Sequence, residues 1–253
     1  MDLKLAGKTA IITGGSGGIG RGLVLGFAGE GCNVVVATRD AKKGQEVADA
    51  CADLPGPVSV IATDVTDRAQ VDATVAETLS LHGAIDVLVN NAGGLVQRVP
   101  VAELTDELFD QVLYLNVRSA LMCIAAAVPH MRKSGGGNII NVTSVAARHG
   151  GGPGAVLYAG SKGFVSTMTR GLAKELVKDN IRVNAVAPGV IYTPFHERYS
   201  SPQMLEGFKA TIPMNRIGTA DECAGAFLFL ASDQMSGYVT GQILEVNGGQ
   251  YMP

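Results

Sequence analysis

Short apolar runs that alternate with longer stretches of helical period constrain the fold of this chain most strongly. The runs are rich in β-branched residues and nearly continuous in hydrophobicity. They cover Thr9–Thr13, Asn33–Ala37, Val58–Ala62, Ile85–Val89, Asn138–Val142, Arg182–Val186 and Gln242–Val246. Such continuity is typical of strands that are covered on both faces, which favours a parallel sheet.

Six stretches between these runs have the apolar spacing of helices. They lie at about Ile19–Glu30, Ala41–Cys51, Arg68–Leu81, Asp106–Lys133, Tyr158–Asp179 and Ala220–Ala231. We expect Pro129 to disturb the last turns of the longest one. Strands that alternate with helices imply βαβ crossovers. The sequence therefore predicts an α/β fold in one domain over residues 1–253, doubly wound, with a seven-stranded, mostly parallel sheet and helices on both faces.

Composition excludes several other classes. The chain has 253 residues, of which 47% are apolar, and 20 Lys and Arg balance 23 Asp and Glu. This is too apolar for a disordered protein and lacks the basic excess of most nucleic-acid binders. The longest uncharged apolar run, Leu121–Val128, is too short to span a bilayer. We therefore expect neither a nucleic-acid partner nor a membrane segment.

The four cysteines, Cys32, Cys51, Cys123 and Cys223, are far apart and have no metal-type spacing. We therefore expect no metal site. Scattered cysteines in a chain of this size are typical of a reducing compartment, and the absence of a visible signal segment favours the cytoplasm.

A glycine-rich turn follows the first predicted strand directly. Residues 13–20 read TGGSGGIG, which satisfies both GxxxGxG and GxGxxG. Glycines let the backbone approach a pyrophosphate closely, and the following helix N-terminus offers N–H groups to the anion. The position between a strand and a helix is the context that a Rossmann-type dinucleotide site requires. The residues expected to line the cofactor here are Gly14, Ser16, Gly17, Gly18, Ile19 and Gly20.

The end of the second predicted strand bears on the choice between NADP and NAD. Thr38 and Arg39 come first, and Asp40 follows. An Arg that faces the ribose would accommodate the 2′-phosphate of NADP, whereas an acidic residue would select NAD. Alternatively, Arg39 is a solvated side chain and Asp40 caps the next helix. We expect NADP, and NAD stays open.

A phenol and an ammonium group stand four residues apart at Tyr158 and Lys162, at the start of a predicted helix. Residues at this spacing share one helical face. A nearby ammonium favours the phenolate, so Lys162 is expected to lower the pKa of Tyr158. Tyr158 then becomes a plausible general acid or base for a carbonyl/alcohol couple. Chance Tyr/Lys pairs are common, and this motif alone is weak.

Further motifs, in chain order, strengthen this interpretation. They are Thr13-Gly14-xxx-Gly18-Ile19-Gly20, Asp64-Val65, Asn90-Asn91-Ala92-Gly93, Asn116, Ser144, Tyr158-xxx-Lys162, Pro188-Gly189 and Val246-Asn247-Gly248-Gly249. Together they resemble the short-chain dehydrogenase/reductase family over essentially the whole chain. Any one motif is unspecific, but the ordered set is highly specific.

The resemblance implies a role for each matching residue. Tyr158 would transfer the proton, and Ser144 would hydrogen-bond the substrate oxygen. Lys162 would bind the nicotinamide ribose, and Asn116 would hold a water in a proton relay. The resemblance also implies cofactor contacts at Asp64 and Val65 (adenine), at Asn91, Ala92 and Gly93, and at Pro188, Gly189, Ile191 and Thr193 (toward the nicotinamide). NADP-using relatives often carry a basic residue where this chain has Gly17, so the NADP prediction depends on Arg39 alone.

Three loops follow strands and are the natural substrate segments, at Gly93–Pro100, Arg148–Ala155 and Pro188–Pro202. Their candidate substrate residues are Gln97, Arg98, Arg148, His149, His196 and Arg198. Each one singly could be a solvated loop residue. Collectively they indicate a polar substrate such as a sugar, polyol or sugar acid, with a 3-oxoacyl thioester as the alternative.

The sequence thus predicts an NAD(P)-dependent oxidoreductase that interconverts a secondary alcohol and a carbonyl of a small molecule. A dinucleotide-binding sensor without catalysis should lack part of the Ser, Tyr and Lys set, which is complete here. The family resemblance also implies a homo-oligomer, either a tetramer or a dimer.

Overall fold

A seven-stranded parallel sheet forms the centre of the computed structural model, which describes residues 2–253. The strand order is β3-β2-β1-β4-β5-β6-β7, and every neighbouring pair is parallel. The strands are β1 (Thr9–Thr13), β2 (Asn33–Thr38), β3 (Val58–Ala62), β4 (Val87–Asn90), β5 (Gly137–Val142), β6 (Ile181–Pro188) and β7 (Ile243–Val246). The predicted doubly wound α/β fold is confirmed, and the sheet is parallel throughout.

Helices connect the strands and cover the sheet. They are α1 (Gly18–Gly29), α2 (Ala41–Asp49), α3 (Arg68–His82), α4 (Asp106–Leu113), α5 (Ser119–Lys133), α6 (Ala146–His149), α7 (Val156–Leu176), α8 (Pro194–Tyr199), α9 (Pro202–Ala210), α10 (Ala220–Ala231) and α11 (Asp233–Ser236). The long predicted helices are confirmed. The segment Pro188–Pro202, predicted as irregular, contains α8, whose six residues are too few to show a helical period.

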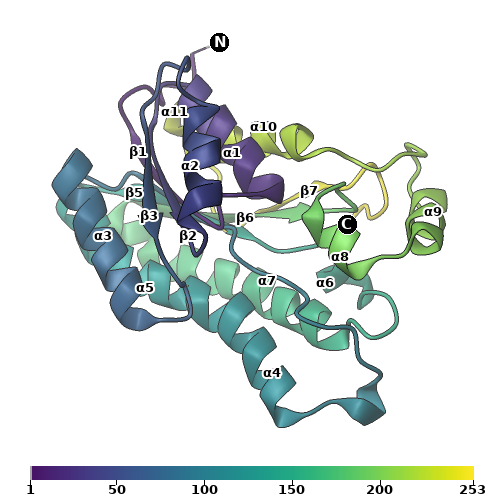
Figure 1. Ribbon diagram of the computed structural model, residues 1–253. Coiled ribbons are helices and arrows are strands. Elements are labelled where there is room, and N and C mark those ends of the chain that lie inside the picture. Colours follow the sequence, from purple (N-terminus) through teal and green to yellow (C-terminus); the bar gives the residue numbers. More distant parts are fainter. Residues whose placement is uncertain (1) are drawn as a thin grey trace.

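Two apolar cores lie on opposite faces of the sheet. Figure 1 shows α1, α2, α10 and α11 over one face and α3, α5 and α7 over the other. On the first face Phe27 of α1 packs with Phe227 of α10, and both are fully buried. On the second face Met131 of α5 and Ile139 of β5 belong to the other core. Both faces of the sheet are therefore covered, as the continuous apolar strands predict.

The predicted helix Asp106–Lys133 is continuous, but it contains a π-helical turn at Tyr114–Arg118. The predicted disturbance at Pro129 is wrong, because α5 continues through it to Lys133. Proline removes only the donor to the carbonyl of Ala125, and Ala125 is exposed. This helix is long and apolar enough to cross a membrane by length and composition alone, and 61% of its most apolar window is buried inside the protein.

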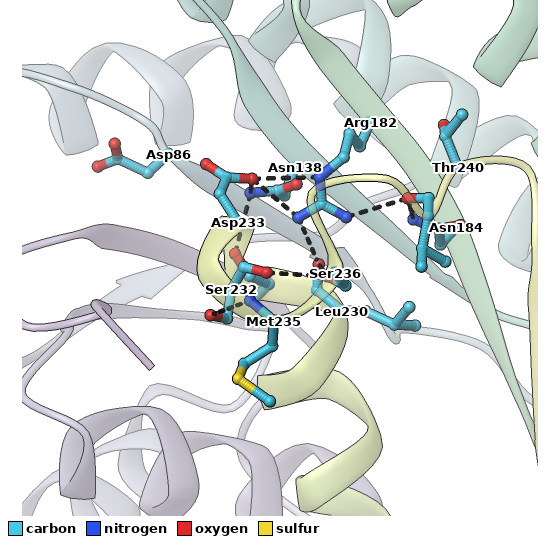
Figure 2. Close-up of polar contacts among 12 residues, drawn as sticks. Asp86, Asn138, Arg182, Asn184, Leu230, Ser232, Asp233, Met235, Ser236 and Thr240 are labelled. Carbon is cyan, nitrogen blue, oxygen red and sulfur yellow. Dashed lines mark hydrogen bonds and ion pairs between the residues drawn. The ribbon is translucent and has the colours of Figure 1, made fainter. Parts of the chain in front are cut away.

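A buried arginine joins the last helices to the sheet. Arg182 of β6 is 8% exposed and donates from Nη2 to the carbonyl of Leu230 at 2.8 Å and to Asp233 at 2.9 Å. Its Nη1 donates to the carbonyl of Val239 at 3.1 Å, and Asn138 of β5 donates to Asp233 at 3.3 Å (Figure 2). The network fixes α10, α11 and the approach to β7 at the amino ends of β5 and β6.

The strand order reverses between β1 and β4. Crossovers leave the sheet in opposite directions at such a point, and a crevice opens beyond the carboxyl ends of the strands. The motif residues follow these ends, because β1 ends at Thr13, β4 at Asn90, β5 at Val142 and β6 at Pro188.

Candidate active site

The glycine turn between β1 and α1 has the shape of an anion site. Gly14 and Gly18 adopt positive φ angles of 65° and 53°, which favour glycine. A Cβ on Gly20 would collide with the carbonyl of Gly14. Gly17, the N-cap of α1, offers no side chain to the helix, and no acidic residue lies in the first turn. The first N–H groups of α1 therefore remain available for an anion.

Asn91 holds this turn against β4. Its Nδ2 donates to the carbonyls of Thr13 at 2.9 Å and Gly14 at 3.2 Å. The Thr13 hydroxyl accepts from the backbone N–H groups of Asn91 and Ala92, both at 3.0 Å. The Asn91 amide is thus committed to backbone partners, so its side chain positions the cofactor turn.

Lys162 and Tyr158 project from the first turns of α7 toward the end of β5. The Lys162 ammonium is buried, donates to the carbonyl of Val142 at 2.8 Å and lies 5.8 Å from the Tyr158 ring centroid. Burial raises the pKa of Tyr158, and a hydrogen bond with Ser144 offsets part of that rise. Burial also lowers the pKa of Lys162 from 10.5 to about 8.

The prediction that Lys162 lowers the Tyr158 pKa is wrong for the structure described. Loss of hydration dominates at both groups, and it disfavours the charged form of each. The ammonium is also directed toward the Val142 carbonyl. The phenol is therefore protonated at neutral pH.

Asn116 lies in the π-helical turn of the long helix. Its Nδ2 donates to the carbonyls of Gly94 at 2.8 Å and Val112 at 3.0 Å, while its Oδ1 accepts from the Gly94 N–H at 2.9 Å. A Cβ on Gly93 would stand 2.7 Å from Asn116 Oδ1 and 3.0 Å from Lys162 Nζ. Asn116 and Lys162 therefore meet across Gly93. Single π turns often occur at functional sites. The water-holding role of Asn116 stays a prediction.

The end of β2 carries the adenosine-side candidates. The hydroxyls of Ser16 and Thr38 are hydrogen-bonded at 2.7 Å. Asp40 accepts from the Lys43 N–H at 3.1 Å and so caps α2. Arg39 is exposed. The carboxylate that could have selected NAD is thus committed to the helix, and Arg39 is the free charge.

Asp64 and Val65 follow β3. Asp64 accepts hydrogen bonds from the N–H and hydroxyl of Thr66, at 2.9 and 2.7 Å. Burial opposes ionisation of Asp64, but these bonds and the charge of Arg39 together lower its pKa. The Val65 side chain belongs to the core, so only the backbone of this residue can face a cofactor.

The segment after β6 reaches the glycine turn. A Cβ on Gly18 would lie 3.4 Å from Cβ of Thr193, which places Thr193 beside the glycine turn. Its contact with the cofactor stays a prediction. Ile191 packs into the first core. Gly189, which follows Pro188, approaches Asn247 so closely that a Cβ on Gly189 would stand 2.7 Å from Cα of Asn247. Gly189 is therefore required by packing against the segment after β7.

The predicted substrate residues divide into two groups. Arg98 donates to the backbone carbonyls of Tyr199 and Pro153, both at 2.9 Å. The assignment of Arg148 is wrong: its guanidinium pairs with Glu245 of β7 at 2.9 Å and lies over the Tyr251 ring, because α6 directs it to the sheet edge. The remaining exposed candidates are Gln97, His149 and Arg198.

His196 lies in α8, and its imidazole is neutral at pH 7. Burial and then the charge of Arg98 lower its pKa to about 4. Its Nδ1 is 2.9 Å from the Ser200 hydroxyl.

Phe195 was missed by sequence reasoning, yet its ring centroid is 5.8 Å from that of Tyr158 and 5.0 Å from that of Tyr199. Phe195 is one of three aromatic residues in a segment predicted as irregular, and nothing in the sequence singled it out.

Comparison with known proteins decides the family. A family model described as enoyl-(acyl carrier protein) reductase matches residues 14–250. The chain is 40% identical over 247 residues to the 3-oxoacyl-[acyl-carrier-protein] reductase of Thermotoga maritima, covering 98% of this chain and 99% of that protein. The chain belongs to the short-chain dehydrogenase/reductase family.

Solved structures of this family agree. A short-chain type dehydrogenase/reductase from Mycobacterium marinum has a TM-score of 0.94 at 34% identity, covering 100% of this chain and 98% of that one. An NADH-dependent reductase responsible for alginate metabolism has a TM-score of 0.90 at 37% identity, covering 99% and 100% of the two chains.

The residues of this short-chain dehydrogenase/reductase fit a nicotinamide dinucleotide. The open N-terminus of α1 and the glycine turn suit the pyrophosphate, Thr193 lies against Gly18 of that turn, and Lys162 Nζ lies beside Gly93. The contacts of Thr193 and Lys162 with the nicotinamide side stay predictions. When bound, the nicotinamide supplies or accepts the hydride. Ser144 and Tyr158 can hold the substrate oxygen, and the protonated Tyr158 phenol can donate its proton to that atom.

Proposed function

We propose that this oxidoreductase works as a carbonyl reductase, with Tyr158 as the proton donor. The observation that carries the proposal is the cluster of Ser144, Tyr158 and Lys162 at the end of β5. A phenol whose pKa is raised by burial is in the acid form that reduction of a carbonyl requires. Alcohol oxidation would first require the phenol to lose this proton.

We propose NADPH as the preferred donor. The support is the exposed Arg39 beside the Ser16–Thr38 hydroxyl pair, with Asp40 committed to capping α2. A guanidinium is well suited to a 2′-phosphate. NADH is the alternative, and a 3-ketoacyl-(acyl-carrier-protein) reductase from Brucella melitensis, 34% identical, was solved with NADH.

We propose a 3-oxoacyl thioester as the substrate, in preference to a sugar. The polar interpretation depended on six loop residues. Two of them, Arg98 and Arg148, are occupied by internal partners, and His196 is neutral. Phe195 instead places an aromatic wall beside Tyr158. The reductase of Thermotoga maritima, at 40% identity, supports the same choice.

A sugar acid is the second candidate. The observation that favours it is the solved reductase responsible for alginate metabolism, which is 37% identical over nearly the whole chain. Arg198 and His149, both exposed on the loops, could meet a carboxylate at the rim.

A substrate screen monitored by cofactor absorbance distinguishes these candidates. Short 3-oxoacyl thioesters and uronate-derived keto acids are each offered with NADPH and with NADH. We expect turnover of the thioesters, with a higher kcat/KM for NADPH. Turnover of the keto acids alone would contradict the thioester proposal, and equal use of both dinucleotides would contradict the NADPH proposal.

We also propose a cytoplasmic homo-oligomer. All four cysteines are free, which supports a reducing location. Large apolar side chains are exposed on the long helices, including Phe109, Tyr114 and Leu121 on Asp106–Lys133 and Phe164 on α7. Exposed apolar side chains grouped on such helices are typical of subunit contacts. A monomeric mass by light scattering at micromolar concentration would contradict this proposal.

A further inference from the structure

Arg98 connects three segments that are far apart in the chain. It lies in the loop after β4, donates from Nη1 to the carbonyl of Pro153 in the loop before α7, and donates from Nε to the carbonyl of Tyr199 at the end of α8. We call these two hydrogen bonds the Arg98 bridge. Within residues 2–253, no other side-chain hydrogen bond joins α8 to either loop.

The backbone around Arg98 is shaped for this connection. The N–H of Val99 donates to the carbonyl of Gly154 at 3.1 Å, which holds the first two loops together. Gly154 has a φ of 72°, and a Cβ there would lie 3.2 Å from Cβ of Arg98. Val96, a β-branched residue, adopts a φ of 66°. Such a residue occupies this region only when its surroundings impose it.

The Arg98 bridge leads to the catalytic tyrosine through aromatic contacts. Tyr199, whose carbonyl accepts from Arg98, packs its ring 5.0 Å from that of Phe195. Phe195 packs 5.8 Å from the ring of Tyr158. On the other side of α8, the ring of His196 is 6.2 Å from that of Phe208 in α9. The position of α8 therefore determines where the Phe195 ring lies relative to Tyr158 and to the substrate oxygen beside it.

The chemistry of the bridge suits arginine alone. Both acceptors are backbone carbonyls, and they accept from two different nitrogens of the guanidinium, Nε and Nη1. A planar guanidinium can donate to both at once, whereas the single ammonium of lysine is a compact point charge. Burial lowers the pKa of Arg98 from its ordinary value, yet an arginine remains charged in proteins.

We propose that Arg98 is a positioning residue for substrate: the Arg98 bridge holds α8 against the two loops and thereby fixes Phe195 beside Tyr158. The inference rests on the proposed carbonyl reduction for its kinetic readout. Arg98 touches neither the reacting atoms nor the dinucleotide turn, so its loss should affect the binding of substrate and leave the binding of cofactor intact.

The test compares wild type with Arg98→Ala and Arg98→Lys. For Arg98→Ala we expect KM for the substrate found in the screen to rise about tenfold or more, since hydrogen bonds from a charged donor are removed. We expect kcat to stay within about threefold and the dissociation constant of NADPH to stay unchanged. Methylguanidinium added to Arg98→Ala should lower KM again, and Arg98→Lys should recover only part of the loss.

Hydrogen exchange gives a readout that does not need turnover. Amides of residues 194–210 should exchange faster in Arg98→Ala than in wild type, while those of β4 and β5 stay protected. Arg132→Met is the matched control, because it removes a surface arginine that pairs with Asp179 at 2.8 Å in another part of the molecule. It should change neither the exchange nor KM.

The outcomes separate the two proposals. Unchanged exchange over 194–210 together with an unchanged KM in Arg98→Ala would overturn the inference. A general loss of stability that also abolishes NADPH binding would overturn it too, because it would show a merely structural role. If wild type turns over neither substrate class, the proposed function fails, and the exchange comparison still decides whether the bridge holds α8.

Discussion

Burial sets the protonation of the two central side chains. Tyr158 is held as a neutral phenol, and the pKa of Lys162 falls to about 8. Both shifts come from the removal of water around groups at the start of α7. A charged ammonium in this position costs folding free energy, and its hydrogen bond to the Val142 carbonyl offsets part of that cost.

The Lys162 shift predicts an unusual dependence of stability on pH. Between about pH 8 and pH 10 the unfolded chain keeps Lys162 protonated, while the folded chain does not. The unfolded state then binds more protons, so the free energy of unfolding rises with pH in this window, by at most about 3 kcal/mol. Denaturant titrations of the cofactor-free protein at pH 7, 8, 9 and 10 measure the rise.

Lys162→Met is the reference for that measurement. The variant keeps the apolar stem and removes the titrating group, so the rise should disappear. Burial raises the pKa of Tyr158 above this pH window. The Tyr158 phenol of the folded protein therefore stays neutral throughout the titration. Identical pH profiles for the two proteins would show that Lys162 is not desolvated as described.

At the same scale, the proposed preference for NADPH depends on Arg39. Arg39→Ala should lower kcat/KM for NADPH about 10-fold to 100-fold, because a charged hydrogen-bond donor to the 2′-phosphate is lost. The value for NADH should stay within about threefold. Steady-state kinetics with both dinucleotides measure this, and an equal loss for the two would mean that Arg39 does not read the phosphate.

At the scale of elements, the glycine turn contains one glycine that packing requires, Gly20, and one that is expected to face the cofactor, Gly17. Gly20→Ala should destabilise the fold by about 1–3 kcal/mol, because its Cβ would meet the Gly14 carbonyl and the Asn91 amide. At Gly17 nothing lies within 4 Å and φ is −171°, so Gly17→Ala should keep stability within about 0.5 kcal/mol.

Binding of dinucleotide then distinguishes the two variants. The Cβ of Gly17→Ala would stand at the open N-terminus of α1, where the pyrophosphate has to approach. We expect weaker dinucleotide binding by titration calorimetry and an unchanged melting temperature. A stable Gly20→Ala protein with wild-type affinity would contradict the role given to the turn.

The sequence predicted elements better than it predicted contacts. All seven strands and the long helices follow from hydrophobic period and continuity, which are local properties. The destination of Arg148 at Glu245 depends on a residue almost a hundred positions later, and nothing local encodes it. Phe195 approaches Tyr158 only because α8 is placed there by the segment after β6. The site residues that belong to local sequence motifs were therefore predictable. The residues whose position depends on how distant loops pack were not.

At the scale of the whole molecule, the buried arginine in Figure 2 holds α10, α11 and the segment before β7 to the sheet. Arg182→Met should lower the free energy of unfolding by about 3 kcal/mol, because it removes the buried charged donor to the carbonyls of Leu230 and Val239 and the cationic partner of Asp233. Lys8→Met removes an exposed ion pair with Asp86 and should cost less than about 1 kcal/mol. Chemical denaturation measures the free energy of unfolding of both variants. Equal losses would contradict the expectation that the buried arginine stabilises the fold more than the exposed ion pair does.

The fold brings the ends of four strands together near Tyr158, the proposed proton donor, so Tyr158 is the residue to test. The measurement is single-turnover hydride transfer by Tyr158→Phe, followed by nicotinamide absorbance, with the dinucleotide dissociation constant determined on the same protein. We expect hydride transfer to fall about 10²-fold to 10⁴-fold while dinucleotide affinity and melting temperature stay at wild-type values. Hydride transfer within about tenfold of wild type would contradict the assignment of Tyr158 as the proton donor.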